Sequence, residues 1–219
     1  DPEGGRFAEP AGPKLAAASG APAVPPHDPD GLLRTPGFKV LHVPDVDFVS
    51  RNRTFRSALT EIREWSAANP FHFPILVLVE LKEDALGVPG STKVLKFDAA
   101  LLDAVDAEIR ETIPEARRFE PDNLRSGLPT LREAVAGKGW PGVDRLLGKV
   151  LFALDNEDAI RDAYLASSPR LEGRAMFVSV DREHPAAAWM KRNDPIRQFD
   201  EIQSLVRDGF LVRTRADAS

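Results

Sequence analysis

Short apolar runs alternate with segments of helical spacing along most of the chain. The runs cover residues 38–42, 74–80, 149–155, 175–181 and 210–215. They are rich in Val, Leu, Ile and Phe, the composition typical of β-strands. The run at 74–80 is apolar at consecutive positions, which predicts a parallel strand that is buried on both faces.

Between these runs, apolar residues recur at intervals of three and four, which predicts amphipathic helices. Phe55, Leu59, Ile62 and Trp65 lie on one helical face, and Asn69-Pro70 ends this helix. Gly209 is expected to end the last helix. The other helical patterns are Leu101, Val105 and Ile109; residues 131–135; Ile160 and Tyr164; and Ile196, Phe199, Ile202 and Leu205.

Strand and helix alternate, and this order indicates right-handed βαβ units, a parallel sheet and the α/β class. No glycine-rich phosphate-binding turn follows any run, so the main nucleotide-binding signatures are absent. A barrel is favoured because the runs end in polar residues, where barrel enzymes hold their active sites. These residues are His42, Glu80, Asp155, Asp181 and Arg213. A closed barrel needs eight strands, whereas the chain supplies five runs.

The proline-rich segment 1–36 interrupts this regularity at the front of the chain. The whole chain contains 19 prolines, and many of them fall before residue 37 without helical or strand periodicity. We expect residues 1–36 to form a surface loop that leads into one domain over residues 37–219.

Composition narrows the function classes. The chain has 219 residues, 42% hydrophobic and 29% charged, which fits one globular domain. A formal charge of -5 gives no cationic excess for binding nucleic acid. The absence of cysteine excludes a disulfide scaffold, a Cys-ligated metal and a Cys nucleophile. The longest apolar run is too short to span a bilayer, and residues 1–5 lack a signal-peptide pattern.

Three of the polar residues suggest chemistry on phosphate. His42 ends the first run beside acidic residues that could hold its tautomer, so it is a candidate general acid or base. A hydrogen-bonded loop histidine is an equally good interpretation. Glu80 and Lys82 alternate after an apolar strand, an arrangement suited to a hard cation and a phosphate oxygen. The alternative for this pair is an internal ion pair.

Arg213 and Arg215 share one face of the last run, and guanidinium groups suit phosphate or carboxylate. Structural pairing with Asp155 or Asp181 is at least as good an explanation. The other three histidines are set aside as candidates: His72 at the amino end of its strand, and His27 and His184 in loops.

Four segments in a particular order carry a resemblance to a known family. They cover residues 37–47, 64–70, 79–82 and 211–217. Together they resemble the calcium-dependent phosphoinositide-specific phospholipase C family of bacteria and fungi, relatives of the glycerophosphodiester phosphodiesterases. Residues 121–122, 130–135 and 139–141 extend the similarity over nearly the whole chain.

This resemblance implies a TIM-type (βα)8 barrel in which two histidines act as acid and base around a calcium ion. An inositol hydroxyl attacks phosphorus, diacylglycerol leaves, and a cyclic phosphate is then open to hydrolysis. His42 matches the second histidine, Glu80 the metal-binding acid, and Lys82 the lysine near the substrate phosphate. Arg213 and Arg215 match a family motif, and we assign them to the substrate from their charge alone.

The departures from the family pattern matter equally. A strand with His-Asn and another with Glu-x-Asp open the family pattern, and neither is present; the segment for an eighth strand is also missing. Asn52 and Ser57 stand where the family often has cysteines, so no disulfide is expected there. We therefore expect about five of eight barrel strands, a fragment truncated at both ends, and no activity from this chain by itself.

The leading hypothesis is a phosphoric diester hydrolase that cleaves phosphatidylinositol. A glycerophosphodiester phosphodiesterase is the alternative enzyme, and a non-catalytic relative that binds a lipid head group or a protein is the alternative class. The resemblance further implies calcium as cofactor, transient contact with a membrane surface, and secretion or another extracytoplasmic location.

Overall fold

A computed structural model describes residues 17–20, 28, 30–44, 47–87, 89 and 91–217. The backbone divides into two compact units. Unit 1 comprises Asp1–Trp65 and Lys82–Phe97, and unit 2 comprises Ser66–Leu81 and Asp98–Ser219. The arrangement expected from the sequence, a loop at 1–36 before one domain, stays a prediction.

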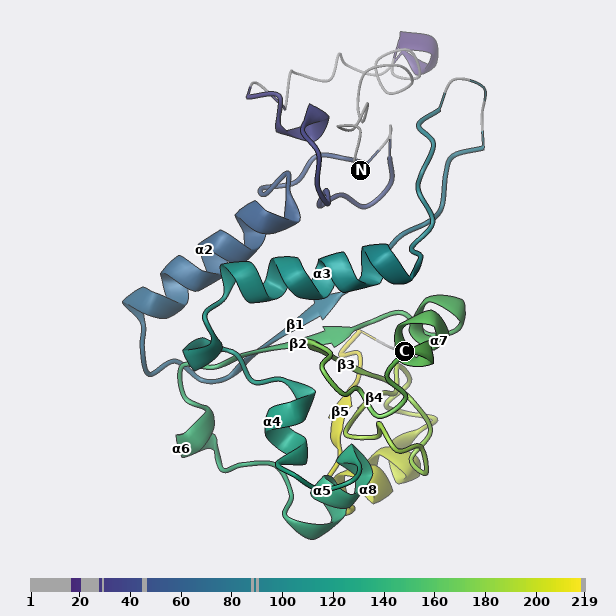
Figure 1. Ribbon diagram of the computed structural model, residues 1–219. Helices are drawn as coiled ribbons and strands as arrows, with labels where there is room; N and C mark the ends of the chain where they lie inside the picture. The colour runs from purple at the N-terminus through teal and green to yellow at the C-terminus, as the bar shows by residue number, and fades with distance from the viewer. Residues whose placement is uncertain are drawn as a thin grey trace. The chain divides into compact units, whose positions relative to one another are not determined.

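Parallel strands form the centre of unit 2. Strands β1 (Ile75–Val79), β2 (Val150–Leu154) and β3 (Met176–Val178) pair in that order, with Val79 opposite Leu154, and lie side by side in Figure 1. Strands β4 (Trp189–Lys191) and β5 (Leu211–Arg213) form a second parallel pair. A parallel bridge between Ser179 and Trp189 links the two sheets. The described residues therefore form an α/β structure with two partial sheets and no closed barrel.

Four of the five predicted strands are confirmed, and the prediction at residues 38–42 is wrong. There, an isolated antiparallel bridge joins Lys39 to Thr54. Phe55 N donates to Phe38 O at 3.0 Å, and Val40 N donates to Arg53 O at 3.1 Å. Because the backbone of this run bonds to a nearby segment, it does not form a parallel ladder. Periodicity alone does not distinguish these two pairings.

The expectation that β1 is buried on both faces is also wrong. Leu76 and Leu78 are 38% and 37% exposed, whereas Val79 is buried. By contrast, β2 is buried at all five positions, as a strand with neighbours on both sides should be. Strand β1 stands at the edge of the described sheet, and its side chains alternate between covered and exposed.

The five predicted helices are confirmed as α2 (Phe55–Ala68), α3 (Ala99–Thr112), α5 (Leu131–Gly137), α7 (Ala159–Ala166) and α8 (Phe199–Arg207). Ile196, which was expected on the last of them, lies in a turn before α8. Their starts have local causes: Asp98 caps α3 by accepting from Leu101 N at 2.9 Å, and Thr130 caps α5. Gly209 follows α8 with φ 89°, as expected for a helix stop. Short elements η1 (Leu32–Arg34), η2 (Glu115–Arg117), α4 (Pro121–Arg125) and α6 (Val143–Leu146) were not predicted.

Unit 1 has a small apolar core. Leu33 and Phe48 are 1% and 3% exposed, and Leu33 belongs to the described end of the proline-rich segment. Asp28 accepts from Leu32 N and Leu33 N and thereby caps η1. The Phe38 ring stacks on the ring of Phe97, with centroids 6.0 Å apart. Most of residues 1–36 lies outside the described residues.

Candidate functional site

Polar side chains follow the strands of unit 2 at their carboxyl ends. Glu80 comes directly after β1 and Asp155 directly after β2. Asp155 N donates to Val79 O at 2.8 Å, so the two strands stay paired up to these acids. Lys191 ends β4 and Arg213 ends β5. Within unit 2, the structure therefore brings the predicted Glu80 beside Asp155, at the edge where barrel enzymes hold their active sites.

Asn156 fixes the chain just beyond Glu80. Its Oδ1 accepts from Leu81 N at 2.7 Å, and its Nδ2 donates to Leu81 O at 2.8 Å. These two side-chain hydrogen bonds take the place of backbone pairing beyond the end of β1. The strand alternation expected to set Glu80 and Lys82 on one face is therefore not continued: Lys82 lies in unit 1, where it is partly buried.

Lys191 is a candidate that the sequence analysis missed. Its side chain is only 11% exposed. Its ammonium lies 2.5 Å from the Asp155 carbonyl oxygen, 3.4 Å from Glu157 Oε2 and 3.6 Å from Asp155 Oδ1. Lys191 N also donates to Ser179 Oγ at 3.0 Å. A signal was available, because the apolar stretch 186–190 ends in a charged residue like the other strands.

Asp155 retains bonding capacity in this cluster. Its Oδ1 is buried and has no hydrogen-bond partner within the described residues. A buried carboxylate oxygen is strongly favoured to interact with a cation or a donor. At this edge, Asp155 can therefore accept from a hydroxyl or contribute an oxygen to a metal, in addition to its ion pair with Lys191.

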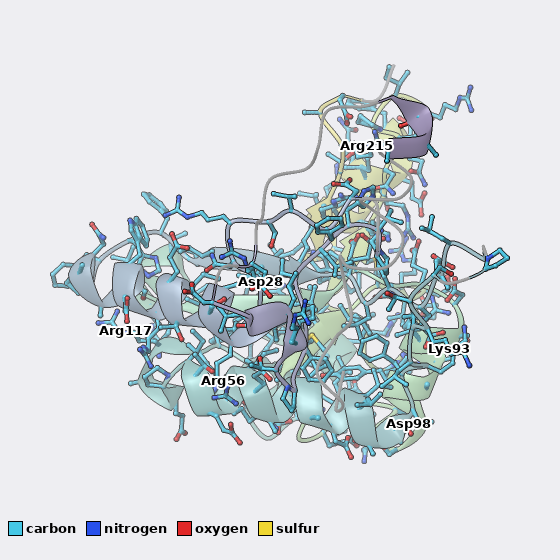
Figure 2. The ribbon with its side chains drawn as sticks, turned by 90° about the horizontal axis from the view of Figure 1, so that it is seen from above. Asp28, Arg56, Lys93, Asp98, Arg117 and Arg215 are labelled. Carbon is cyan, nitrogen blue, oxygen red and sulfur yellow. The ribbon has the colours of Figure 1, made fainter. Side chains whose placement is uncertain are left out.

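The two C-terminal arginines have different partners. Arg213 donates to Asn193 Oδ1 at the end of β5. Arg215 lies beyond the strand, on the C-terminal segment labelled in Figure 2, with its Nη2 2.8 Å from Asp217 Oδ2. The hydrogen bond from Arg215 lowers the pKa of Asp217 to about 2. The recorded partners are thus Asn193 and Asp217, whereas the sequence suggested Asp155 or Asp181.

In unit 1, His42 lies in a turn closed by Asp47. His42 N and Val43 N both donate to Asp47 O, at 3.0 and 2.9 Å. The ring Nδ1 is 2.7 Å from Asp47 Oδ2, and both side chains are well exposed. A carboxylate at Nδ1 favours the tautomer with the proton there, which leaves Nε2 to exchange protons. Asp47 is thus an acidic neighbour in contact with the ring, and the assignment of the tautomer and of the catalytic role stays a prediction.

Among the described residues, the predicted calcium site is not complete. His42 and Lys82 belong to unit 1, and Glu80, Arg213 and Arg215 to unit 2. No group of three or more His, Asp or Glu side chains that could hold a metal occurs among the described residues. Calcium takes six to eight oxygen ligands, so Glu80 and Asp155 provide only part of such a set.

The histidines set aside have structural contacts. His72 Nε2 is 2.8 Å from Ser66 Oγ in the turn before β1. His184 Nδ1 accepts from Ala186 N at 3.1 Å, and burial lowers the pKa of His184. Both contacts agree with the exclusion of these rings from the candidate site. His27 lies outside the described residues.

Comparison with protein families gives a match over residues 1–219 to the family described as phosphoinositide phospholipase C, Ca²⁺-dependent. The chain belongs to this family. The match covers both units, so the resemblance found in the sequence is confirmed. No curated protein matches the chain.

Solved structures add evidence on the fold. Two are apo forms of a calcium-dependent phosphoinositol-specific phospholipase C from Pseudomonas sp.. Both are 18% identical, with TM-scores of 0.56 and 0.55, and cover 80% and 75% of this chain. A third, from Streptomyces antibioticus, is 24% identical over 77% of this chain with a TM-score of 0.46. The chain spans 62%, 58% and 53% of these proteins' lengths, respectively.

The phospholipase C family membership and the two Pseudomonas structures agree with the expected fold class. The described strands pair in parallel, most are connected by helices, and they are followed by polar residues at their carboxyl ends, as in a (βα)8 barrel. The described residues correspond to an incomplete barrel. Among them, no helix has the length and apolar character needed to cross a membrane.

Proposed function

We propose that the protein containing this chain is a phosphoric diester hydrolase that cleaves phosphatidylinositol to diacylglycerol and an inositol phosphate. Family membership over the whole chain supports the reaction class. The geometric support for the proposal is the distance of 2.7 Å between His42 Nδ1 and Asp47 Oδ2. A histidine whose tautomer is set by a carboxylate is suited to moving a proton at its other nitrogen.

His42 is proposed as the general acid, which protonates the leaving oxygen of diacylglycerol through Nε2. Asp47 is a positioning residue, because it contacts the ring and not the reacting atoms. Lys82, Arg213 and Arg215 are proposed to bind the substrate phosphate or inositol ring. Lys191 joins them because its ammonium is held at the carboxyl edge of the strands by Asp155 and Glu157.

Calcium is the proposed cofactor, and the family description names it. Glu80 and Asp155, which directly follow the paired strands β1 and β2, would supply carboxylate oxygens to the ion. When bound, calcium would stabilise negative charge on the phosphate oxygens. We propose that the protein acts outside the cytoplasm, in transient contact with membranes that contain its substrate.

The test is calcium-dependent release of diacylglycerol from phosphatidylinositol by the whole protein and its His42→Ala variant. General acid–base catalysis contributes roughly 10²–10⁴-fold, so kcat is expected to fall by about that factor. The matched control is His27→Ala, a histidine outside the candidate set, which should keep wild-type kcat. Unchanged turnover in His42→Ala would exclude the role of this histidine.

Asp47→Asn separates positioning from catalysis. Asparagine can still bond to the ring but does not stabilise the imidazolium, so kcat should fall less than in His42→Ala while KM stays close to wild type. Release of a free alcohol in place of diacylglycerol would indicate the glycerophosphodiester phosphodiesterase alternative. If Asp47→Asn raised KM and left kcat unchanged, the turn would serve substrate binding and not proton transfer.

A further inference from the structure

A basic cavity of about 780 Å³ lies in unit 2, away from the strand ends described above. It is lined by η2, α4, the 138–141 turn and residues around α6. Figure 1 shows α4 and α6 on the same side of the sheet. Lys149, one of its lining residues, immediately precedes β2, whereas Asp155 immediately follows that strand. The cavity is thus at the amino end of the sheet, opposite the candidate catalytic edge.

The lining is strongly cationic on a chain whose net charge is -5. Four basic residues, Arg118, Lys138, Arg145 and Lys149, line the cavity with one acidic residue, Glu115. A concentration of one sign of charge in a concave site raises the local potential and attracts ligands of the opposite sign. An anion is therefore the chemistry that this cavity fits.

Three of these four cations have no acidic partner among the residues that the structure describes. Arg118 is paired with Glu120 at 2.9 Å. Lys149 Nζ donates to the carbonyl of Ala116 at 2.6 Å, which leaves its charge uncompensated. Within the described part of the chain, the structure records no ion pair for the side chain of Lys138 or Arg145. The substrate phosphate proposed above does not explain these charges. They lie at the amino ends of the strands, whereas the candidate catalytic residues follow the carboxyl ends.

Neutral donors and a rigid wall complete the cavity. Asn123 uses its Oδ1 to accept from Glu120 N at 2.7 Å, which turns its amide nitrogen to other acceptors. The Trp140 ring packs between Phe119 and Phe177, at centroid distances of 6.1 and 5.2 Å. Trp140 is therefore held by aromatic contacts, and only the exposed cations need to be ordered when a ligand binds.

We propose that this cavity is a second binding site, which takes a small compound that carries a phosphomonoester. Lys138, Arg145 and Lys149 bind the phosphate oxygens, with Asn123 as a neutral donor. A volume of about 780 Å³ is within the usual range for small-molecule sites. A soluble ligand is favoured over a lipid, because a membrane seated here would face away from the candidate catalytic edge.

Isothermal titration calorimetry on the full chain tests the site with inorganic phosphate and glycerol 3-phosphate, and with glycerol as the uncharged control. Saturable binding of both phosphates, and none of glycerol, is expected. The double variant Lys138→Gln, Arg145→Gln should weaken glycerol 3-phosphate binding about ten-fold or more. Both residues are exposed, so folding should not change, and circular dichroism checks this.

The matched control is Arg197→Gln, Arg207→Gln, which removes the same charge from exposed positions near and on α8. It should change the dissociation constant less than two-fold. Equal weakening in the two double variants, or no binding of either phosphate at millimolar concentration, would overturn the site. Vesicles of phosphatidylcholine with phosphatidic acid, compared with phosphatidylcholine alone, identify the source: binding to the acidic vesicles that is lost in Lys138→Gln, Arg145→Gln would assign the phosphate to a lipid.

Discussion

Tyr164 lies at the centre of a buried polar network between α3 and α7. Its hydroxyl donates to Asp106 Oδ1 at 2.6 Å and accepts from Met176 N at 3.1 Å. Arg174 Nη1 lies 3.2 Å from Asp106 Oδ2, and its guanidinium stacks on the tyrosine ring at 4.3 Å. Burial raises the pKa of Asp106 and, aided by Asp106, raises the pKa of Tyr164 well above 10.0. The network is thus held with the phenol protonated.

We expect Tyr164→Phe to lower the free energy of unfolding by about 1–3 kcal/mol, because it leaves Asp106 Oδ1 and the Met176 amide without a partner. Urea denaturation at neutral pH measures this loss. Asp103→Asn, at the 68% exposed end of the Arg174 pair, should cost at most about 1 kcal/mol. A larger effect of Asp103→Asn than of Tyr164→Phe would contradict this account.

The same residue predicts a pH dependence. Because the folded pKa of Tyr164 is raised, the folded chain keeps the phenolic proton longer than the unfolded chain does. The stabilisation from the buried phenol is therefore fully present below the ordinary pKa of 10.0. It is lost as the pH rises from there through the raised pKa of the folded state. Tyr164 is the single tyrosine of the chain, so absorbance reports its titration directly. Titration near the ordinary pKa in the folded state would contradict its burial.

At the scale of elements, Gly148 sets the approach of β2 to the turn before β1. Its φ is 72°, and a Cβ at this position would lie 2.4 Å from the backbone oxygen of Pro70. Gly148 N donates to His72 O at 2.8 Å, and two residues later Val150 begins the register with Ile75. Close backbone contact at this glycine therefore fixes where the two strands start to pair.

Gly148→Ala and Gly139→Ala form a matched pair of variants. Gly139 also has a left-handed backbone, with φ 71°, but nothing lies within 4 Å of its added Cβ. Gly139→Ala should cost about 1–2 kcal/mol from backbone strain alone. Gly148→Ala should cost about 1–3 kcal/mol more, because the Pro70 backbone must move. Chemical denaturation measures the loss of stability in both variants. Equal losses would mean that the backbone of residues 70–72 shifts without any cost in stability.

At the scale of the whole molecule, the described residues do not complete the expected metal site. Among the described residues, no three acidic or histidine side chains gather for a metal. We therefore predict that the 219-residue chain binds no calcium at submillimolar concentration and does not cleave phosphatidylinositol. Calcium titration by calorimetry and a diacylglycerol assay check this. Saturable binding that is lost in Glu80→Gln would show that the chain builds the site by itself.

The sequence by itself determined the α/β class, five of the helices and four of the strands. Continuous apolar runs marked the strands, and apolar residues spaced three and four apart marked the buried face of each helix. The polar residues at the strand ends, Glu80 and Arg213 among them, were found in the same way. Proline, glycine and capping residues marked boundaries through local backbone chemistry, as at Asp98 and Gly209.

Only the tertiary structure decided which partners each element would find. The apolar run at 38–42 pairs with Thr54 in place of a sheet, and the three-residue strand β4 forms because it pairs with β5. Lys191 became a candidate only through its contact with Asp155, which lies 36 residues earlier in the chain. The basic cavity likewise combines residues from separate elements. Such contacts depend on how the elements pack in space, and they cannot be predicted from the hydrophobic pattern of one segment.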